Sequence, residues 1–194
     1  RLFNESQMTK LYYIGPMFRY ERPQKGRFRQ FYQVGAEILS SDDNPAIEAE
    51  ILEMLMLLFD RLKVNDLRTV INSVGCRECR PIFSLRLQEA IRDRLSCLCE
   101  NCKRRANSNP LRVFDCKTSS CQPFLEELPA ITDNICDECS KHFEKFRLFL
   151  DERGIDYRID KRLVRGLDYY MRTTFEILSA RLGAQDALVG GGRY

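Results

Sequence analysis

The 194-residue sequence predicts an α+β fold in which part of an antiparallel sheet, with flanking helices, is interrupted by a helical insertion. Two stretches, residues 11–21 and 30–39, are rich in Tyr, Phe, Ile and Val and read as strands. All nine cysteines then fall within residues 76–154, a charged segment that lacks the alternation of strands. Strand-like sequence returns after it, at residues 156–160, 173–180 and 186–190.

The first two strands form a predicted hairpin with a positively charged tip. Pro23 and Gly26 are turn residues between the strands. The second strand offers Gln33 and Glu37, which could hold an ammonium group. A hairpin with cations at one end and a carboxylate at the other can orient both halves of an amino acid–ATP pair. The basic residues of the tip are Arg19, Arg22, Lys25, Arg27 and Arg29.

Apolar spacing and capping residues indicate the helices. Apolar residues recur at helical spacing from residue 47 to residue 62, behind Asn44 as a cap and Pro45 at the first helical position. Residues 67–74 read as a further strand, whereas 80–98 and 132–153 read as helices. The predicted organisation is therefore two parts of one sheet domain, residues 1–74 and 161–194, around a Cys-rich helical insertion at residues 75–160.

The composition is that of a soluble globular protein. The net charge is +3, the hydrophobic fraction 44% and the charged fraction 30%, which are ordinary values. The net charge is too small to indicate nucleic-acid binding by itself. No apolar run approaches the length of a membrane span, and residues 1–10 lack the apolar core of a secretory signal.

The cysteines show the spacing of a thiolate metal site. Zinc takes four thiolate or imidazole ligands, and each Cys-x-x-Cys pair supplies two. If zinc is bound, we expect a structural site of four ligands that joins the two ends of the insertion. Cys76 and Cys79 are equally allowed as a partner pair in such a site. Free thiols are the open alternative, and an odd count without a secretory signal disfavours disulfides. The expected ligands are Cys99, Cys102, Cys136 and Cys139.

His142 follows Cys139 by three residues, so the two side chains would share one helix face. A metal-ligand role gains only modest support from this spacing. We expect His142 to be a surface residue of its helix.

Three motifs carry a resemblance to a known family. Residues 18–21, Phe-Arg-Tyr-Glu, resemble motif 2 of class II aminoacyl-tRNA synthetases. Residues 21–31, followed by the Gln-Val-Gly-Ala-Glu of residues 33–37, resemble histidyl-tRNA synthetases in particular. Residues 163–170 are similar to the first histidine-specific signature of that family, and residues 190–194 to the start of the second. Gly190 stands where the family usually has Ala, which is a small change.

The resemblance implies a ligase whose sheet is the antiparallel sheet of class II synthetases. The intact protein is expected to activate L-histidine with ATP and Mg²⁺ to histidyl-adenylate and to transfer it to tRNA(His). It also implies a cytoplasmic homodimer. Motif 1, motif 3 and the anticodon-binding domain are expected outside this chain, which alone should not support efficient aminoacylation. The alternative is the non-catalytic, histidine-sensing regulatory subunit of ATP phosphoribosyltransferase, which shares the fold.

The resemblance assigns three hairpin residues to ATP. Arg19 would hold the α-phosphate and the histidine carboxylate, because a planar guanidinium can bind two oxygens where negative charge develops. Glu21 would lie on the ATP side, and Arg27 would meet the outer phosphates. The presence of Arg19, Arg27 and Arg165 favours the enzyme over the regulatory subunit.

The resemblance assigns the remaining positions to histidine. Gln33 and Glu37 would bind the α-amino group. Arg165 would be a catalytic cation at the α-phosphate and would also contact histidine. Tyr169 and Tyr170 would line the imidazole pocket, although core packing is the expected role for one of the pair.

A basic run in the insertion would face tRNA according to the same resemblance. An insertion at this position approaches the acceptor stem in the family, and phosphate contacts of this kind are salt-sensitive and indifferent to sequence. A solvated surface is the common alternative for such a run. The residues are Lys103, Arg104, Arg105 and Arg112.

Overall fold

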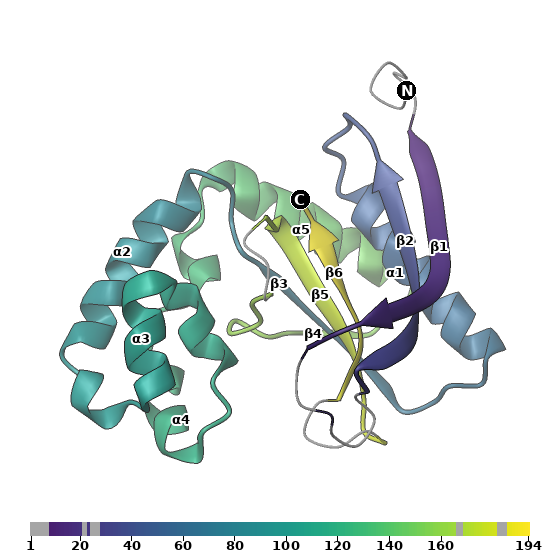
Figure 1. Cartoon of the computed structure of the whole chain (residues 1–194). Coiled ribbons are helices and arrows are strands. Elements are labelled where there is room, and N and C mark those ends of the chain that lie inside the picture. Colours follow the sequence, from purple (N-terminus) through teal and green to yellow (C-terminus); the bar gives the residue numbers. More distant parts are fainter. Residues whose placement is uncertain (1–7, 21–22, 24–27, 166–168, 182–185) are drawn as a thin grey trace.

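The computed structural model describes residues 8–20, 23, 28–165, 169–181 and 186–194. It contains a β-hairpin, a four-stranded sheet with two helices packed on it, and a lobe of shorter helices beside the sheet (Figure 1). The α+β class predicted from the sequence is confirmed. None of the helices in the described part of the chain is both long and apolar enough to cross a membrane.

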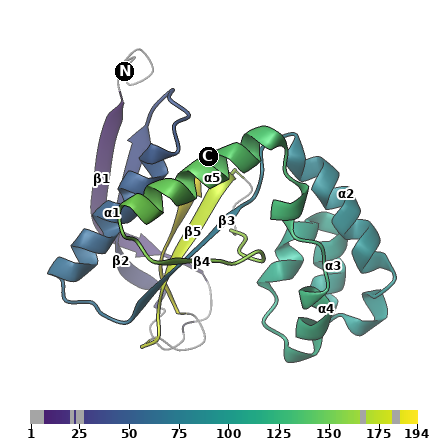
Figure 2. The same cartoon turned by 180° about the vertical axis from the view of Figure 1, so that it is seen from behind.

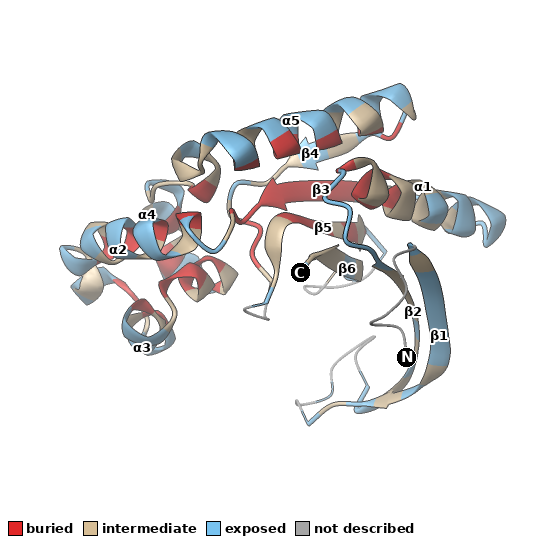
Figure 3. Ribbon diagram, turned by 90° about the horizontal axis from the view of Figure 1, so that it is seen from above, coloured by how far each residue is buried: buried red, intermediate tan, exposed pale blue. Residues whose placement is uncertain are grey.

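The hairpin joins β1 (Thr9–Phe18) to β2 (Gln30–Leu39) in antiparallel register, with Thr9 opposite Leu39 and Phe18 opposite Gln30. The ladder continues by one bond toward the tip, because the Arg19 amide donates to the Arg29 carbonyl at 2.8 Å. The predicted hairpin is confirmed, with a first strand that ends earlier than residue 21. Its side chains are largely exposed, in contrast to β3 and β5 (Figure 3).

The larger sheet has the strand order β4-β3-β5-β6. β5 pairs antiparallel with both β3 and β6, whereas β3 and β4 are parallel. The sheet therefore has the antiparallel part that was predicted, and β4 adds one parallel pair to it. A parallel pair needs a long crossover connection, and the whole segment between β3 and β4 supplies it. The strands are β3 (Leu67–Ser73), β4 (Tyr157–Ile159), β5 (Met171–Ser179) and β6 (Ala187–Arg193).

Two helices, α1 (Ala46–Arg61) and α5 (Asp137–Glu152), pack on this sheet (Figure 2). The Asn44 side chain accepts a hydrogen bond from the Ala46 amide at 3.0 Å, so Asn44 caps the start of α1 as predicted. Burial of the apolar residues between helices and sheet is the main stabilising contribution here, at about 1.5–3 kcal/mol for each large side chain. The fully buried members are Ala49, Leu52, Ile71, Phe146, Leu150 and Ile177.

The insertion lobe comprises α2 (Cys79–Arg92), α3 (Glu100–Ser108), α4 (Gln122–Glu126) and short 3₁₀ segments. The predicted helix at residues 80–98 is interrupted after Arg92, and the one at 132–153 begins only at Asp137. The break in the second helix lies at Ile135 and Cys136, which both have extended backbone (ψ 156° and 164°) between the 3₁₀ segment and α5. The 3₁₀ segments are Leu95–Cys97, Pro110–Asp115, Ser119–Cys121 and Ile131–Asn134.

Two hydrophobic cores correspond to the sheet and the lobe. The lobe core is built around Phe83, Leu87, Val113 and Ile131. The sheet core includes Phe146 of α5, so α5 packs with the sheet although it follows the lobe in sequence. The predicted domain limits at residues 75 and 160 stay a prediction. Judged by the residues that pack into its core, the lobe extends from α2 to the segment Ile131–Asn134.

Candidate functional site

One face of the hairpin carries three of the predicted ligand-binding residues. Side chains alternate along a strand, and opposed residues of an antiparallel pair share a face, so Arg19, Gln33 and Glu37 lie on the same side. The Arg19 guanidinium lies over the Phe31 ring, 3.7 Å from its centroid. The Gln33 side-chain amide donates to the Tyr13 hydroxyl at 2.5 Å. Neighbours on the same face therefore orient two of these groups.

Tyr194, which follows β6, links the hairpin to the sheet. Its hydroxyl donates to Glu37 Oε2 at 2.9 Å, and its ring meets the Tyr169 ring edge-on with 5.4 Å between centroids. The hydrogen bond to Glu37, together with burial, raises the pKa of Tyr194 to about 12, so the phenol stays protonated at neutral pH. The sequence analysis gave Tyr194 no role of its own, because its two partners lie far away in the chain.

Arg165 lies against β5 and β6. Its guanidinium pairs with Glu176, and its buried Nε has no hydrogen-bond partner among the described residues. Burial raises the pKa of Glu176, and the charge of Arg165 opposes that shift. The guanidinium fits closely above Gly190, where an added Cβ would lie 2.4 Å from Arg165 Cζ. The presence of Gly instead of Ala at position 190, which was expected to matter little, therefore leaves more space for the Arg165 guanidinium.

The two tyrosines after Arg165 have different surroundings. Their rings are 4.8 Å apart between centroids, and Tyr169 is 53% exposed. Tyr170 packs against the core of the insertion lobe, and burial raises its pKa. Tyr170 therefore has the core-packing role expected for one of the pair, and Tyr169 is the tyrosine available to a ligand.

An open hollow of about 770 Å³ lies between the insertion lobe and the sheet. Tyr169 and Tyr194 line it from the sheet side, and Arg77 and Arg80 line it from α2. Aromatic surface and cationic groups thus share one concave region next to Glu37.

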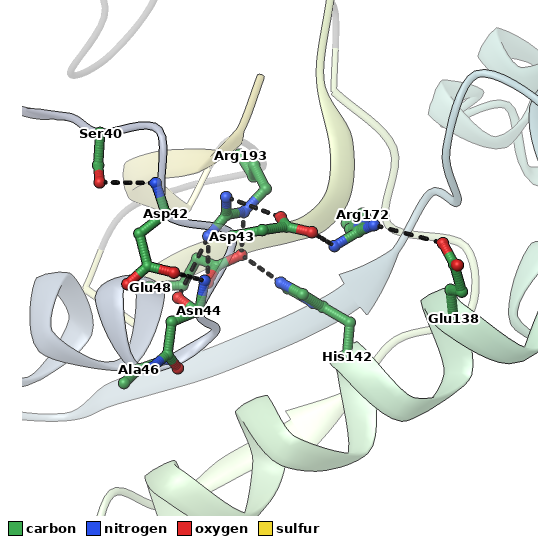
Figure 4. A network of polar contacts seen from close by, with 10 residues as sticks. All are labelled: Ser40, Asp42, Asp43, Asn44, Ala46, Glu48, Glu138, His142, Arg172 and Arg193. Carbon is green, nitrogen blue, oxygen red and sulfur yellow. Dashed lines mark hydrogen bonds and ion pairs between the residues drawn. The ribbon is translucent and has the colours of Figure 1, made fainter. Parts of the chain in front are cut away.

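A polar network beneath this region joins α1, α5 and β6 (Figure 4). The Arg193 guanidinium donates to both oxygens of Glu48, at 2.8 and 3.0 Å, and to Asp43 at 3.1 Å. His142 Nε2 lies 3.4 Å from Glu48 Oε1. His142 is 6% exposed, and burial lowers its pKa, so the expectation of a surface residue was wrong. These residues span positions 43 to 193 and form no local motif, which is why the sequence did not reveal the network.

Of the residues named from the sequence, five in the hairpin tip lie outside the described residues: Glu21, Arg22, Lys25, Gly26 and Arg27. The roles expected for Glu21 and Arg27 at ATP stay predictions.

The basic run of the insertion is partly paired within the lobe. Lys103 pairs with Glu100 at 2.7 Å, and Arg112 with Asp115 at 3.2 Å. Arg105 donates to the Arg112 carbonyl at 3.0 Å. Two of the four cations, Lys103 and Arg112, are thus paired with carboxylates of the lobe itself.

The cysteines form two quartets, and the predicted quartet was wrong. Cys99 and Cys102 meet Cys116 and Cys121, which we call the lobe quartet. Cys136 and Cys139 instead meet Cys76 and Cys79, the pair left as an alternative, and we call this group the junction quartet. Within each quartet all four sulfur atoms lie within 4.8 Å of one another, so each could hold a metal ion.

The thiols of each quartet differ in acidity. Burial alone would raise the pKa of Cys76, but backbone hydrogen bonds from Cys79 and Glu78 lower it to about 7. The backbone amide of Cys102 lowers the pKa of Cys99 to about 6. Burial raises the pKa of Cys102 and Cys139. Each quartet thus contains one thiol with a lowered pKa beside at least one thiol whose pKa is raised.

The fold is that of an aminoacyl-tRNA synthetase. It matches the crystal structure of apo S. aureus histidyl-tRNA synthetase with a TM-score of 0.74 and 35% identity, over 98% of this chain and 45% of that one. A second structure, titled an ATP phosphoribosyltransferase regulatory subunit/histidyl-tRNA synthetase from Bacillus halodurans C, matches with a TM-score of 0.62 at 18% identity. The second match covers 100% of this chain and 53% of that one, and shows the fold alone.

The chain belongs to the histidyl-tRNA synthetase family, whose sequence profile matches residues 1–104. The histidine–tRNA ligase of Desulforamulus reducens is 53% identical over 97% of this chain and 45% of that protein. The histidine–tRNA ligase of Solibacter usitatus is 48% identical over 100% of this chain and 47% of that protein. The chain therefore spans about half the length of the curated relatives it matches.

Proposed function

We propose that the protein containing this chain activates L-histidine with ATP and Mg²⁺ to histidyl-adenylate and transfers the histidyl group to tRNA(His). The observation that carries the proposal is the position of Tyr194, which contacts Glu37 on the hairpin and Tyr169 of the histidine-specific segment. It supports a single site shared by the hairpin and the histidine-specific segment. Relatives named histidine–tRNA ligase support the same conclusion.

Each described side chain has a chemical role in this proposal. Attack of the histidine carboxylate on the α-phosphorus builds negative charge, which Arg19 and Arg165 would stabilise. Glu37 and Gln33 would bind the α-amino group as an anionic and a neutral acceptor. Tyr169 would contact the imidazole from the side of the hollow. A cytoplasmic homodimer, as the family resemblance implies, belongs to the proposal.

The test is histidine-dependent ATP–pyrophosphate exchange by the full-length protein beside its Arg165→Ala variant. We expect exchange in the parent and a loss of about 10²–10³-fold in the variant, the usual effect of removing one stabilising donor. Arg181→Ala is the matched control, because Arg181 also pairs with a carboxylate, Asp66, but is 67% exposed in its side chain. Exchange in this control should equal that of the parent.

The competing function is the histidine-sensing regulatory subunit. Histidine binding without exchange for any amino acid would establish that function and exclude the ligase. The chain alone, without the remaining half of its relatives' length, should not support efficient aminoacylation. Turnover by the isolated chain at a rate comparable with the full-length protein would contradict this.

We also propose that the insertion holds a structural zinc ion, at the lobe quartet and not at the residues first expected. Cys99 and Cys116 have sulfur atoms 3.8 Å apart, and the Cys99 amide donates to the Cys121 sulfur at 3.3 Å. Four sulfur ligands leave no open position, so the ion would stabilise the lobe and take no part in the reaction. The lobe would present Lys103 and Arg104 to the tRNA acceptor stem.

A further inference from the structure

The junction quartet lies where the chain leaves the sheet and where it returns to it. Cys76 and Cys79 follow β3 and open α2, whereas Cys136 and Cys139 open α5. We propose that these four cysteines bind a second structural zinc ion, which fastens both ends of the insertion beside the end of β3, an inner strand of the sheet.

The sulfur positions fit one tetrahedral ion. Zinc–sulfur bonds of about 2.3 Å place the four sulfurs about 3.8 Å from one another. The sulfurs of Cys76 and Cys79 are 3.5 Å apart, and those of Cys79 and Cys139 are 4.0 Å apart. A disulfide would need about 2.05 Å, and all nine cysteines are free. An all-sulfur tetrahedral set is typical of zinc or iron–sulfur sites, and the close spacing favours a single ion.

The backbone of both pairs has the same turn. The Arg80 amide donates to the Cys76 carbonyl at 3.2 Å, and the Ser140 amide donates to the Cys136 carbonyl at 2.9 Å. The lobe quartet repeats this turn, with the Lys103 amide bonded to the Cys99 carbonyl at 3.0 Å. Three Cys-x-x-Cys pairs thus open a helix in the same way, with their sulfurs near the positive end of its dipole.

The junction quartet also has a close link between its two halves. The Cys136 amide donates to the Cys79 sulfur at 3.1 Å, and such bonds stabilise a thiolate. Gly75 allows the first pair to turn inward, because its φ is 67° and an added Cβ would lie 2.7 Å from the Cys79 Cβ. Cys79 and Cys139 are 3% and 0% exposed, so this polar cluster is largely withdrawn from water. Four clustered thiolates, two of them buried, would repel one another without a cation, and a dication removes that cost.

The ion would also hold the strand that follows Tyr169 and Tyr170. The Arg172 amide donates to the Gly75 carbonyl at 2.7 Å, and the Val74 amide donates to the Arg172 carbonyl at 2.7 Å. Arg80 donates to the Tyr170 carbonyl at 2.9 Å. Residues on both sides of the first cysteine pair therefore bond directly to the start of β5.

The test is the zinc content of the full-length protein, purified without chelators and measured by mass spectrometry of the metals. Cys136→Ser should lose one zinc per chain relative to the parent. Cys136→His should retain it, because three thiolates and an imidazole still form a complete zinc site. Cys97→Ser is the matched control, since Cys97 is exposed and belongs to neither quartet.

The outcomes separate metal binding from simple packing. An unchanged zinc content in Cys136→Ser, or iron in place of zinc in the parent, would overturn the proposal. If Cys136→Ser does not fold, Cys136→His decides: a folded variant with zinc supports the site, and a folded variant without it overturns the site. These measurements do not depend on histidine activation, so they stand apart from the proposed function.

Hydrogen exchange tests the link to β5. The Arg172 amide should exchange about tenfold faster or more in Cys136→Ser, because the Gly75 carbonyl that accepts it is no longer held in place. Exchange in Cys97→Ser should match the parent. Equal exchange rates in Cys136→Ser and the parent would show that the junction site does not position this strand.

Discussion

Replacement of Glu48 by Ala should destabilise the fold far more than replacement of its neighbour Glu50. Glu48 is 6% exposed and accepts two hydrogen bonds from Arg193. Breaking a buried ion pair costs about 3–5 kcal/mol, because the remaining charge stays buried. Arg193 keeps a partner in Asp43 at 3.1 Å, so we expect the lower end, about 3 kcal/mol.

Glu50 provides the control within the same helix. It pairs with Lys10, but both side chains are about half exposed, at 45% and 54%. Exposed pairs of this kind contribute at most about 1 kcal/mol. Glu48→Ala should therefore lower the melting temperature by about 6–12 °C, and Glu50→Ala by no more than about 4 °C.

Urea denaturation followed by far-UV circular dichroism measures both variants, which suits a chain without tryptophan. Glu48→Gln should fall between parent and Glu48→Ala, because the amide keeps one acceptor oxygen but not the charge. A loss below about 1 kcal/mol for Glu48→Ala, or equal losses in both alanine variants, would refute the reasoning that burial makes this pair important.

Three further predictions concern pH, backbone and ligand binding. His142, the single histidine of the chain, has its pKa lowered by burial; as the pH falls below about 6.5 the unfolded chain gains a proton that the folded chain does not, so stability falls. His142→Asn should remove this part of the pH dependence in denaturation curves. Gly75→Ala should cost about 1–2 kcal/mol, because of its positive φ and the contact with Cys79, and zinc content should fall with it. Tyr194→Phe removes the hydrogen bond to Glu37 and should weaken histidine binding about fivefold in calorimetric titrations of the full-length protein; unchanged affinity would mean that the phenol does not orient Glu37.

Local sequence patterns were sufficient to predict individual strands and helix caps of the fold. The strand predicted at residues 30–39 has these bounds in β2 (Gln30–Leu39), and the cap at Asn44 forms as expected. Both depend only on neighbours in sequence, which alternation and capping rules describe. The strand expected at residues 156–160 is present as β4, but its parallel pairing with β3 was not predictable in this way, because local pattern does not determine which strands pair or in which direction.

The candidate site was only partly predictable for the same reason. The motifs located Arg19, Gln33, Glu37 and Arg165, but not the groups that orient them. Tyr194 bonds to a residue 157 positions away, and no local rule links such distant residues. The cysteine spacing likewise identified the pairs correctly, whereas the way the chain folds decides which pairs meet.

Because side chains alternate along the hairpin, the number of residues in its strands is constrained both in evolution and in engineering. Gln33 and Glu37 face the same side because they are four positions apart, an even step, on a regular strand. Deletion of one residue between them would turn one of the two to the opposite face, beside the exposed side chains of Tyr32 and Val34. Insertions and deletions in β2 should therefore be tolerated only in steps of two.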